Sequence, residues 1–323
     1  MCSVGPVKRE TAVAQPPDQV APRSLQVIGG RDDMVAADPA GLGLQAVGDG
    51  KMWVDARFRS KLDRGGLVSI GAVMATTDGR CLRTLADREN WHLQLHDAHQ
   101  QLHGVYLKKH HVRTWRSWLR AKLQLGPGKT AGYTEARNAQ ELSDEGIDCI
   151  RVLAYGEQLL AGGLVESFVL TDELTGYTQL DHFLPARFPV RETKQTAPRD
   201  RDLARLIRQV AQIARKLHAA GYNHRDLYCC HFFIKEMMPG RFDIKLIDLQ
   251  RVQHRRRFRR RWLVKDLAQL AWSATRPEIS CAQKMAFMRH YLGVRRLRPR
   301  DKRFIRRVLS KQRRMERRLG PAP

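Results

Sequence analysis

Residues 224–227 read His224-Arg225-Asp226-Leu227, and they come directly after a stretch with apolar residues at helical spacing. A second aspartate, in Leu246-Ile247-Asp248-Leu249, follows 22 residues later and ends a segment that predicts a strand. An aspartate after a helix and another at the end of a strand can face one metal–phosphate site. One of them would accept the proton of an attacking hydroxyl, and the other would hold Mg²⁺. Because phosphoryl transfer requires this division of labour, the pair predicts that chemistry.

Residues upstream supply the groups that such a site needs around the nucleotide. The run Val105-Tyr106-Leu107-Lys108 alternates as a strand does, and Lys108 stands where a lysine would bind nucleotide phosphates. We predict a helix over residues 134–145, capped by Thr134. Glu135 in its first turn is the expected ion-pair partner of Lys108. Lys109 and Glu141 are the rivals for these two roles.

The patterns along the chain divide it into three parts. Residues 1–48 are rich in Pro, Gly, Ala and Asp and show no sustained period, which is typical of a disordered tail. Residues 49–172 contain strand patterns, including an expected hairpin between residues 91–95 and 105–108. Residues 173–319 are mainly helical in pattern. Strands followed by helices predict an α+β protein with a small sheet-rich lobe and a larger helical lobe.

Three runs in the second half resemble a known family: HRDLYCCHFFIK at 224–235, KLIDLQRVQ at 245–253 and RRWLVKDLAQLAWS at 260–273. They are similar to the lipopolysaccharide core kinases, which phosphorylate Kdo or heptose and are distant relatives of protein kinases. The segments GVYLKKH, SFVLTDEL and DEGIDCIRVLAYGE fit as well, so the resemblance covers roughly residues 80–275. It implies a two-lobed protein-kinase-like fold, with a small antiparallel-sheet N-lobe and a helical C-lobe. It also implies an ATP-dependent kinase that acts on a Kdo or heptose sugar of the lipopolysaccharide inner core.

The resemblance implies a role for each matching residue. The catalytic and metal-binding set comprises His224, Arg225, Asp226 and Asp248. The ATP-binding set comprises Lys108, Glu135, Asp172, Leu174 and His231. Within these sets Asp226 is the base and Asp248 binds Mg²⁺, while residues 171–174 form a hinge that meets adenine through its backbone. Asp266 supports the catalytic loop from below.

Several positions depart from the protein-kinase pattern. His231 stands where protein kinases carry asparagine, and the lipopolysaccharide kinases resemble this chain in having histidine there. Instead of binding the metal directly, His231 could contact a phosphate or support the metal ligands. Gln250 replaces the glycine that follows the metal aspartate. The expected loop over the phosphates, residues 82–90, contains no glycine. Only 17 residues separate Asp248 from Asp266, so we expect no control by phosphorylation of an activation loop.

The charge of the chain predicts a polyanionic partner. Lys and Arg number 58 against 33 Asp and Glu, which gives a net charge of +25. The densest cluster, Arg255–Arg257 with Arg259–Arg261, is either a solvated loop or a contact for the acceptor or a lipid phosphate. The final helix, expected over residues 301–319, has one apolar and one basic face. It packs on the helical lobe, lies on an anionic membrane, or does both.

Compartment and partners follow from the remaining features. No apolar run is long enough to span a membrane, no secretory signal is visible, and the six cysteines show no pairing pattern, so we expect a cytoplasmic protein with free thiols. The expected partners are the lipopolysaccharide core glycolipid and the inner face of the cytoplasmic membrane, with no obligate protein partner. Two alternatives remain: a kinase with a protein or small-molecule acceptor, and a basic nucleic-acid-binding scaffold or pseudokinase. The second lacks any signature of a nucleic-acid-binding fold.

Overall fold

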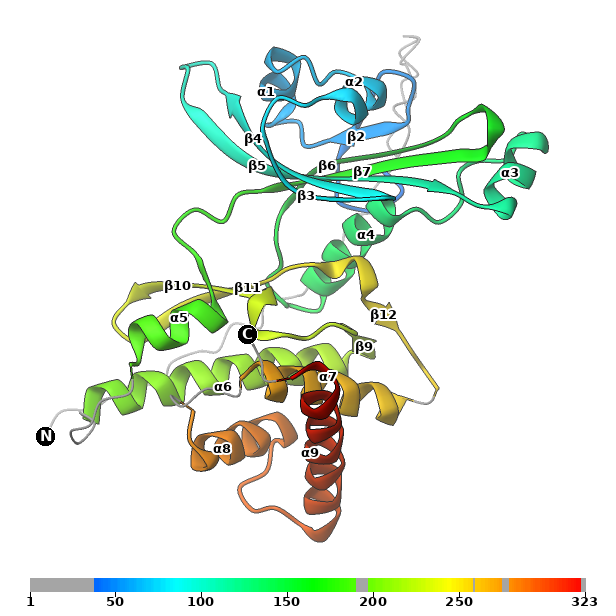
Figure 1. Ribbon diagram of the computed structural model, residues 1–323. Coiled ribbons are helices and arrows are strands. Elements are labelled where there is room, and N and C mark those ends of the chain that lie inside the picture. The colour runs from blue at the N-terminus through cyan, green and yellow to red at the C-terminus, as the bar shows by residue number, and fades with distance from the viewer. Residues whose placement is uncertain (1–37, 190–196, 258, 275–278, 321–323) are drawn as a thin grey trace, which may run out of the picture. The chain divides into compact units, whose positions relative to one another are not determined.

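The computed structural model describes residues 38–189, 197–257, 259–274 and 279–320. These residues form an N-lobe built on a seven-stranded antiparallel sheet and a largely helical C-lobe (Figure 1). The strand order in the large sheet is β1-β2-β6-β7-β5-β4-β3. Its strands are β1 (Gln45–Val47), β2 (Met52–Val54), β3 (Arg80–Leu85), β4 (Arg88–His96), β5 (Leu102–Arg113), β6 (Val152–Leu159) and β7 (Leu164–Asp172).

Four helices accompany the sheet of the N-lobe. Figure 1 shows α1 (Arg59–Arg64) and α2 (Ile70–Ala75) on the face that points away from the C-lobe, and α4 (Ala131–Asp144) on the opposite face. A short helix, α3 (Trp115–Lys122), packs on the 3-10 turn η1 (Ala161–Gly163) that joins β6 to β7. The sheet therefore separates one helical layer from the helix that contributes to the site.

Apolar side chains that alternate with polar ones along β4 and β5 form part of the N-lobe core. Leu93 and Leu95 of β4 and Val105 and Leu107 of β5 are buried, and the residues between them point to the other face. The two strands pair in register from Arg88 opposite His110 to His96 opposite Leu102, so the expected hairpin is confirmed. Lys108 lies on the face that carries α4, because it alternates with the buried leucine before it.

Helix α4 starts one turn earlier than predicted. Its cap is Thr130, whose side chain accepts a hydrogen bond from the backbone N–H of Tyr133 at 3.2 Å. Thr134, the predicted cap, lies inside the helix and donates its hydroxyl to the Thr130 carbonyl at 2.5 Å. At Gly132 a Cβ atom would lie 2.3 Å from the Phe168 carbonyl oxygen. The glycine thus lets α4 approach β7 closely.

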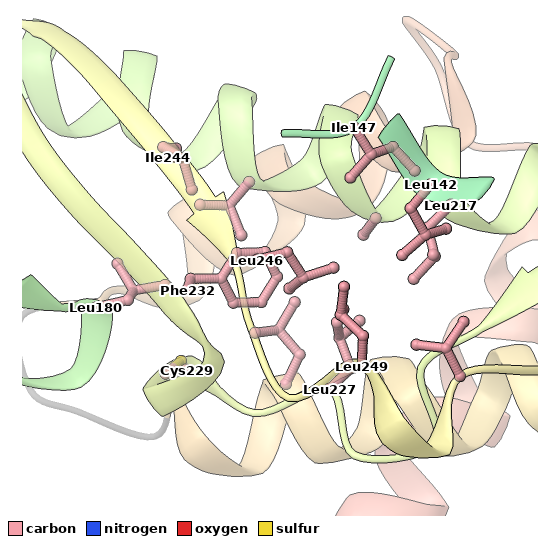
Figure 2. Close-up of a cluster of buried hydrophobic side chains, with 14 of the residues drawn as sticks. Leu142, Ile147, Leu180, Leu217, Leu227, Cys229, Phe232, Ile244, Leu246 and Leu249 are labelled. Atoms are coloured by element: carbon pink, nitrogen blue, oxygen red, sulfur yellow. The ribbon is translucent and has the colours of Figure 1, made fainter. Parts of the chain in front are cut away.

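The C-lobe combines helices with short strands. Its helices are α5 (Leu180–Arg187), α6 (Ala197–Ala219), α7 (Arg259–Ser273), α8 (Cys281–Leu292) and α9 (Pro299–Leu319). Its strands are β8 (Thr178–Gln179), β9 (Tyr222–Asn223), β10 (Phe232–Met238), β11 (Arg241–Leu246) and β12 (Gln253–His254), and two 3-10 turns are η2 (Cys229–His231) and η3 (Leu249–Arg251). Figure 2 shows the apolar core beneath the site, where Leu227, Phe232, Leu246 and Leu249 lie close together.

The folded part of the chain begins earlier than its composition indicates. Residues 38–48, whose composition predicts part of the disordered tail, include β1, and Ala40 and Leu44 are buried in the core. The Tyr155 hydroxyl donates to Asp38 at 2.5 Å. This segment is held by contacts with residues more than a hundred positions away, so local composition could not reveal it. Residues 1–37 lie outside the described residues.

The last helix uses its apolar face inside the protein. Phe304, Ile305 and Val308 of α9 are buried, and α9 packs against α7. The packed interpretation of this helix is therefore correct. Throughout the described ranges, no helix combines the length and the apolar character that crossing a membrane requires.

Candidate active site

The loop His224–Leu227 is held from below by a buried carboxylate. Asp266 of α7 is fully buried and accepts hydrogen bonds from the backbone N–H groups of His224 at 2.8 Å and Arg225 at 2.9 Å. The ring of His218 on α6 meets the same carboxylate at 3.2 Å. Arg225 has a φ of 72°, a conformation that a non-glycine residue adopts only when its surroundings impose it. Asp266 thus fixes the backbone that presents Asp226.

Three polar side chains surround the Asp226 carboxylate. Arg251 of η3 pairs with it at 2.7 Å, Lys265 of α7 lies 3.9 Å away, and the Gln269 amide lies 3.5 Å away. The next residue, Leu227, is buried in the core shown in Figure 2. A carboxylate anchored by a buried neighbour and surrounded by donors is positioned rather than free to rotate. It can accept a proton from a hydroxyl that comes within hydrogen-bond distance of it.

Asp248 follows β11 and is presented in a similar way. Its φ is 59°, and the following residue, Leu249, is fully buried. The amide of Asn138 on α4 donates to the carbonyl of Leu249 at 2.7 Å and to that of Val252 at 3.2 Å. Helix α4 therefore holds the segment after Asp248 directly. Because α4 also carries Glu135, the same helix contacts both Lys108 and the segment that follows Asp248.

Lys108 joins the two lobes at the centre of the site. Its ammonium group lies 2.7 Å from the Glu135 carboxylate and 3.3 Å from the Asp248 carboxylate. Burial opposes the charge of Lys108, but the two carboxylates outweigh it and raise its pKa. Burial likewise works against the ionised form of Asp248, yet Lys108 and His231 together lower its pKa. Both groups are therefore charged at neutral pH.

The rival residues lie elsewhere. Lys109 points to the opposite face of the sheet, where its ammonium group contacts the Thr76 carbonyl at 2.5 Å and lies over the ring of Trp91. Glu141 pairs with Arg137 and accepts a hydrogen bond from the Tyr222 hydroxyl. Of the alternatives considered from the sequence, Lys108 and Glu135 are the two that pair with each other, and Lys108 is the one that reaches Asp248.

His231 lies between the two aspartates. Its Nδ1 is 2.6 Å from the backbone carbonyl of Asp226, and its Nε2 is 3.6 Å from the Asp248 carboxylate. Its ring stacks on that of His224, with 5.6 Å between centroids. Burial lowers the pKa of His224 to about 4, so that ring is neutral. His231 thus ties the catalytic loop to the segment that carries Asp248.

The carboxylates fit a magnesium ion bound together with nucleotide phosphates. Among the described residues there is no group of three or more His, Cys, Asp or Glu side chains that could hold a metal by themselves. Mg²⁺ commonly uses one or two carboxylates and completes its shell with phosphate oxygens and water. Asp248 offers one such carboxylate, and its second oxygen faces His231. The residues present therefore fit a metal that arrives with the nucleotide.

The predicted hinge lies at the end of β7. The N–H of Asp172 donates to the Arg151 carbonyl at 3.0 Å, and its carboxylate meets the His103 ring at 2.8 Å. Within the described part of the chain, the N–H of Leu174 makes no hydrogen bond. Leu174 rather than Asp172 can thus offer an N–H to an adenine ring. The predicted phosphate loop, residues 82–90, forms the β3–β4 hairpin, in which Leu85 pairs with Arg88.

A basic surface adjoins the catalytic loop. The indole of Trp262 on α7 lies beneath three guanidinium groups, at 5.2 Å from Arg225, 4.4 Å from Arg255 and 4.9 Å from Arg261. A groove of about 490 Å³ beside it is lined by Arg260, Arg261, Trp262, Val264, Lys265, Arg307 and Lys311. Arg255 and Arg261 of the arginine cluster noted in the sequence therefore lie against Trp262, on the helix whose Lys265 approaches Asp226, and their contact with an acceptor stays a prediction.

Sequence reasoning missed several side chains around Asp226. Those missed are Trp262, Lys265 and Gln269. They recur at the spacing of one helical face together with Asp266, which was predicted, and all four reach the loop at residues 224–227. That spacing could have revealed Gln269 and Lys265 once Asp266 was identified. Arg251 had no comparable signal, because its contact depends on how η3 turns back toward the loop.

Comparisons with known proteins agree with this arrangement. The model of the lipopolysaccharide kinase (Kdo/WaaP) family matches residues 74–291. The lipopolysaccharide core heptose(I) kinase WaaP of Escherichia coli K12 is 30% identical over 220 residues, which cover 67% of this chain and 79% of that protein. The enzyme of the same name from Pseudomonas aeruginosa is 30% identical over 195 residues, covering 58% and 69%. A solved structure described as WaaP in complex with acyl carrier protein superposes with a TM-score of 0.58 at 27% identity, covering 83% of this chain and 97% of that one.

Proposed function

Because this chain belongs to the lipopolysaccharide kinase (Kdo/WaaP) family, whose relatives are kinases of a sugar hydroxyl, we propose that it phosphorylates a heptose of the lipopolysaccharide inner core. The phosphoryl donor is ATP. The curated relatives named above are heptose(I) kinases, which favours heptose over Kdo as the acceptor sugar. The reaction joins the γ-phosphorus to the sugar oxygen, breaks the bond to ADP, and releases one proton from the hydroxyl.

One observation carries the proposal: Lys108 bridges Glu135 and Asp248 beside a catalytic loop that presents Asp226. Asp226 accepts the proton of the sugar hydroxyl. Lys108, held in place by Glu135, binds the phosphates of the nucleotide. Mg²⁺ bound at Asp248 would neutralise charge on those phosphates. Leu174 supplies a backbone N–H to adenine, and His231 positions the two aspartates relative to each other.

The surface beside Asp226 suits an anionic glycolipid. Arg225, Arg255 and Arg261 surround Trp262 at the mouth of the groove. Guanidinium groups bind carboxylate and phosphate groups in a bidentate manner, and both occur on a lipopolysaccharide core. The lipid part of such an acceptor lies in a bilayer. We therefore place the enzyme at the inner face of the cytoplasmic membrane, as a peripheral protein.

Replacing the base tests the mechanism. Asp226→Asn keeps the size of the side chain but cannot accept the proton, so phosphate transfer from ATP to a heptose-containing lipopolysaccharide acceptor should fall at least about a hundredfold. The matched control is Asp148→Asn, since the Asp148 side chain is 73% exposed and lies outside the site. Transfer at the wild-type rate by the Asp226 variant would refute the mechanism.

The same assay distinguishes the acceptors. We expect label in lipopolysaccharide that contains heptose and none in a core truncated after Kdo. Label in the truncated core would move the assignment to Kdo. Label in added proteins but in neither lipid would favour the protein-acceptor alternative.

We propose a second partner, an acyl carrier protein, because a solved relative was obtained in complex with one. The sequence predicted no obligate protein partner. That prediction is untested, and the present proposal is its alternative. Support comes from an apolar cavity of about 120 Å³ in the C-lobe, which is lined mostly by aliphatic and aromatic side chains. It is bounded by α5, α6, α7, α8 and α9, including Leu206, Leu270, Phe287 and Ile305. An acyl chain has the chemistry to fill it.

Native mass spectrometry of the chain purified from bacteria tests the second partner. We expect a complex with acyl carrier protein, and we expect Ala274→Phe, which narrows the cavity, to reduce the bound fraction. Gly126→Ala is the control, because a methyl group there meets nothing within 4 Å. A wild-type chain that carries no carrier protein, and whose melting temperature does not change when acylated carrier protein is added, would contradict the proposal.

A further inference from the structure

Helix α3 presents an apolar stripe to solvent. Trp115, Trp118 and Leu119 fall on one helical face, and the two indoles are 70% and 45% exposed. Leu123 and Leu125, just after the helix, are also exposed. A stripe at this spacing is usually a buried face. Here the buried side of the helix is Ser117 instead, which packs toward η1.

The charges around this stripe have one sign. Residues 112–129 contain five basic side chains and no Asp or Glu: Arg113, Arg116, Arg120, Lys122 and Lys129. The Lys122 ammonium group lies 4.0 Å from the centre of the Trp118 ring, and the Arg116 guanidinium lies 5.4 Å from the Trp115 ring. Cations therefore alternate with the exposed indoles on the same short helix.

A basic pocket opens beside the stripe. It has a volume of about 360 Å³, and its polar lining includes Arg116, Arg120, Lys129, Thr130 and His110. Among the described residues that line it there is no acidic side chain. Thr130 is the cap of α4, so the amino-terminal end of that 14-residue helix, which favours anions, faces the pocket.

A buried imidazole lines the same pocket and is a second feature besides the amino-terminal end of α4. His110 is only 4% exposed and lines the pocket, and its Nε2 has no hydrogen-bond partner. Burial lowers the pKa of His110 to about 4, so the ring is neutral. Arg116 and Lys129 supply positive charge in the same pocket, beside this buried ring nitrogen without a partner. The pocket therefore has the positive charge that a phosphate group needs, next to a buried polar atom whose hydrogen-bonding capacity is unused.

We propose that α3 docks the protein on an anionic phospholipid bilayer. The exposed stripe enters the interface between headgroups and acyl chains, and the adjacent pocket takes a lipid phosphate. Indole rings are typical of this interfacial position, and basic side chains are attracted to anionic lipid. This inference deepens the peripheral membrane location proposed above and rests on it. It assigns the contact to the N-lobe rather than to the C-terminal helix.

Helix α9 is the competing element, and its packing argues against it. Its basic face is exposed, but Phe304, Ile305 and Val308 are buried against the C-lobe. An amphipathic helix binds a bilayer through its apolar face as well as its charges. Because most of that face is used inside the protein, α9 exposes only Leu309 and Leu319 beside its charges, whereas α3 exposes two tryptophans and a leucine on one face.

Two variants of the full chain test the two parts of the proposal. The stripe variant is Trp115→Ser with Trp118→Ser, and the pocket variant is Arg116→Gln with Lys129→Gln. Arg120 is left unchanged, because its guanidinium donates to the Gly126 carbonyl. The controls are Met237→Ser with Met238→Ser, which removes two exposed apolar side chains elsewhere, and Arg313→Gln with Arg314→Gln on α9.

The measurement is cosedimentation with vesicles of phosphatidylcholine, with and without phosphatidylglycerol. The wild-type chain and both controls should bind the anionic vesicles. The stripe variant should lose at least about tenfold in partition coefficient. The pocket variant should lose roughly 25-fold on anionic vesicles and little on neutral ones. All variants should keep transfer to a detergent-dispersed acceptor.

The possible failures are distinguishable. Wild-type binding by the stripe variant or the pocket variant would overturn the proposal, as would an equal loss by the α9 control. A wild-type chain that phosphorylates its acceptor but ignores both kinds of vesicle would overturn it and leave the kinase function intact. Vesicle binding through α3 without phosphate transfer to any acceptor would support the docking surface and refute the proposed function.

Discussion

A left-handed backbone position lies beside Asp226 and another at Asp248. Arg225 precedes Asp226 with a φ of 72°, and Asp248 itself has a φ of 59°. Such conformations cost on the order of 1–3 kcal/mol each and persist where the surroundings over-determine them. Two hydrogen bonds to Asp266 fix the first, while the buried Leu249 and the Asn138 amide fix the segment after the second. The strain is stored where the chemistry needs fixed carboxylates.

Protonation of His224 makes the stability of the folded chain depend on pH. The ring is fully buried, its Nε2 meets the Ile247 carbonyl at 3.1 Å, and its Nδ1 has no partner. Burial lowers its pKa to about 4, against about 6.5 in the unfolded chain. The stability that it contributes is therefore complete above pH 6.5 and is lost as the pH falls toward 4. The loss amounts to about 3 kcal/mol over that range.

The variant His224→Gln isolates this contribution. An amide keeps a donor for Ile247 but cannot be protonated, so its free energy of unfolding should fall about 3 kcal/mol less between pH 7 and pH 4 than that of the wild type. Urea unfolding at several pH values measures this. His182→Gln, at an exposed position, should keep the wild-type dependence. A pH dependence of His224→Gln equal to that of the wild type would show that the ring is not held neutral.

Helices and strands differ in how much of them the sequence reveals. Alternation in β4 and β5 predicted both the hairpin and the face that carries Lys108, because burial on one side of a sheet imposes a period of two. The predicted start of α4 was four residues late, since Thr130 and Thr134 are equally good caps and only the packing of Gly132 on β7 chooses between them. Local pattern fixes an element, and tertiary contacts fix its ends.

Side chains that meet across distant elements were the least predictable. The order of His224-Arg225-Asp226 and Asp248 was enough to expect a shared site. The ion pair between Arg251 and Asp226 depends on the turn of η3, which no sequence period reports. Helix α3 illustrates the same limit, because its apolar residues have the spacing of a core helix, yet Trp115 faces solvent. Burial is decided by the whole fold, so exposed apolar residues there indicate a surface that binds something.

The two lobes meet at the groups proposed to bind the nucleotide. Lys108 comes from the N-lobe sheet and Asp248 from the C-lobe, and their ion pair spans the junction. Asn138 of α4 adds a second connection through the carbonyls of Leu249 and Val252. A ligand that touches both sides must therefore stabilise the lobes together rather than either one alone.

Thermal unfolding with nucleotide tests this coupling. At a concentration about a hundred times its Kd, ATP with Mg²⁺ should stabilise the native chain by about 2.7 kcal/mol, which corresponds to a rise in Tm of about 5 °C. ATP without the metal should give a smaller rise, because the phosphate charges then face Asp248 without neutralisation. In Asp248→Asn the increment due to Mg²⁺ should vanish, whereas Asp148→Asn, at an exposed position, should keep it. If the Asp248 variant responded to Mg²⁺ as fully as the wild type, the metal would bind elsewhere. The division of roles between the two aspartates would then be wrong.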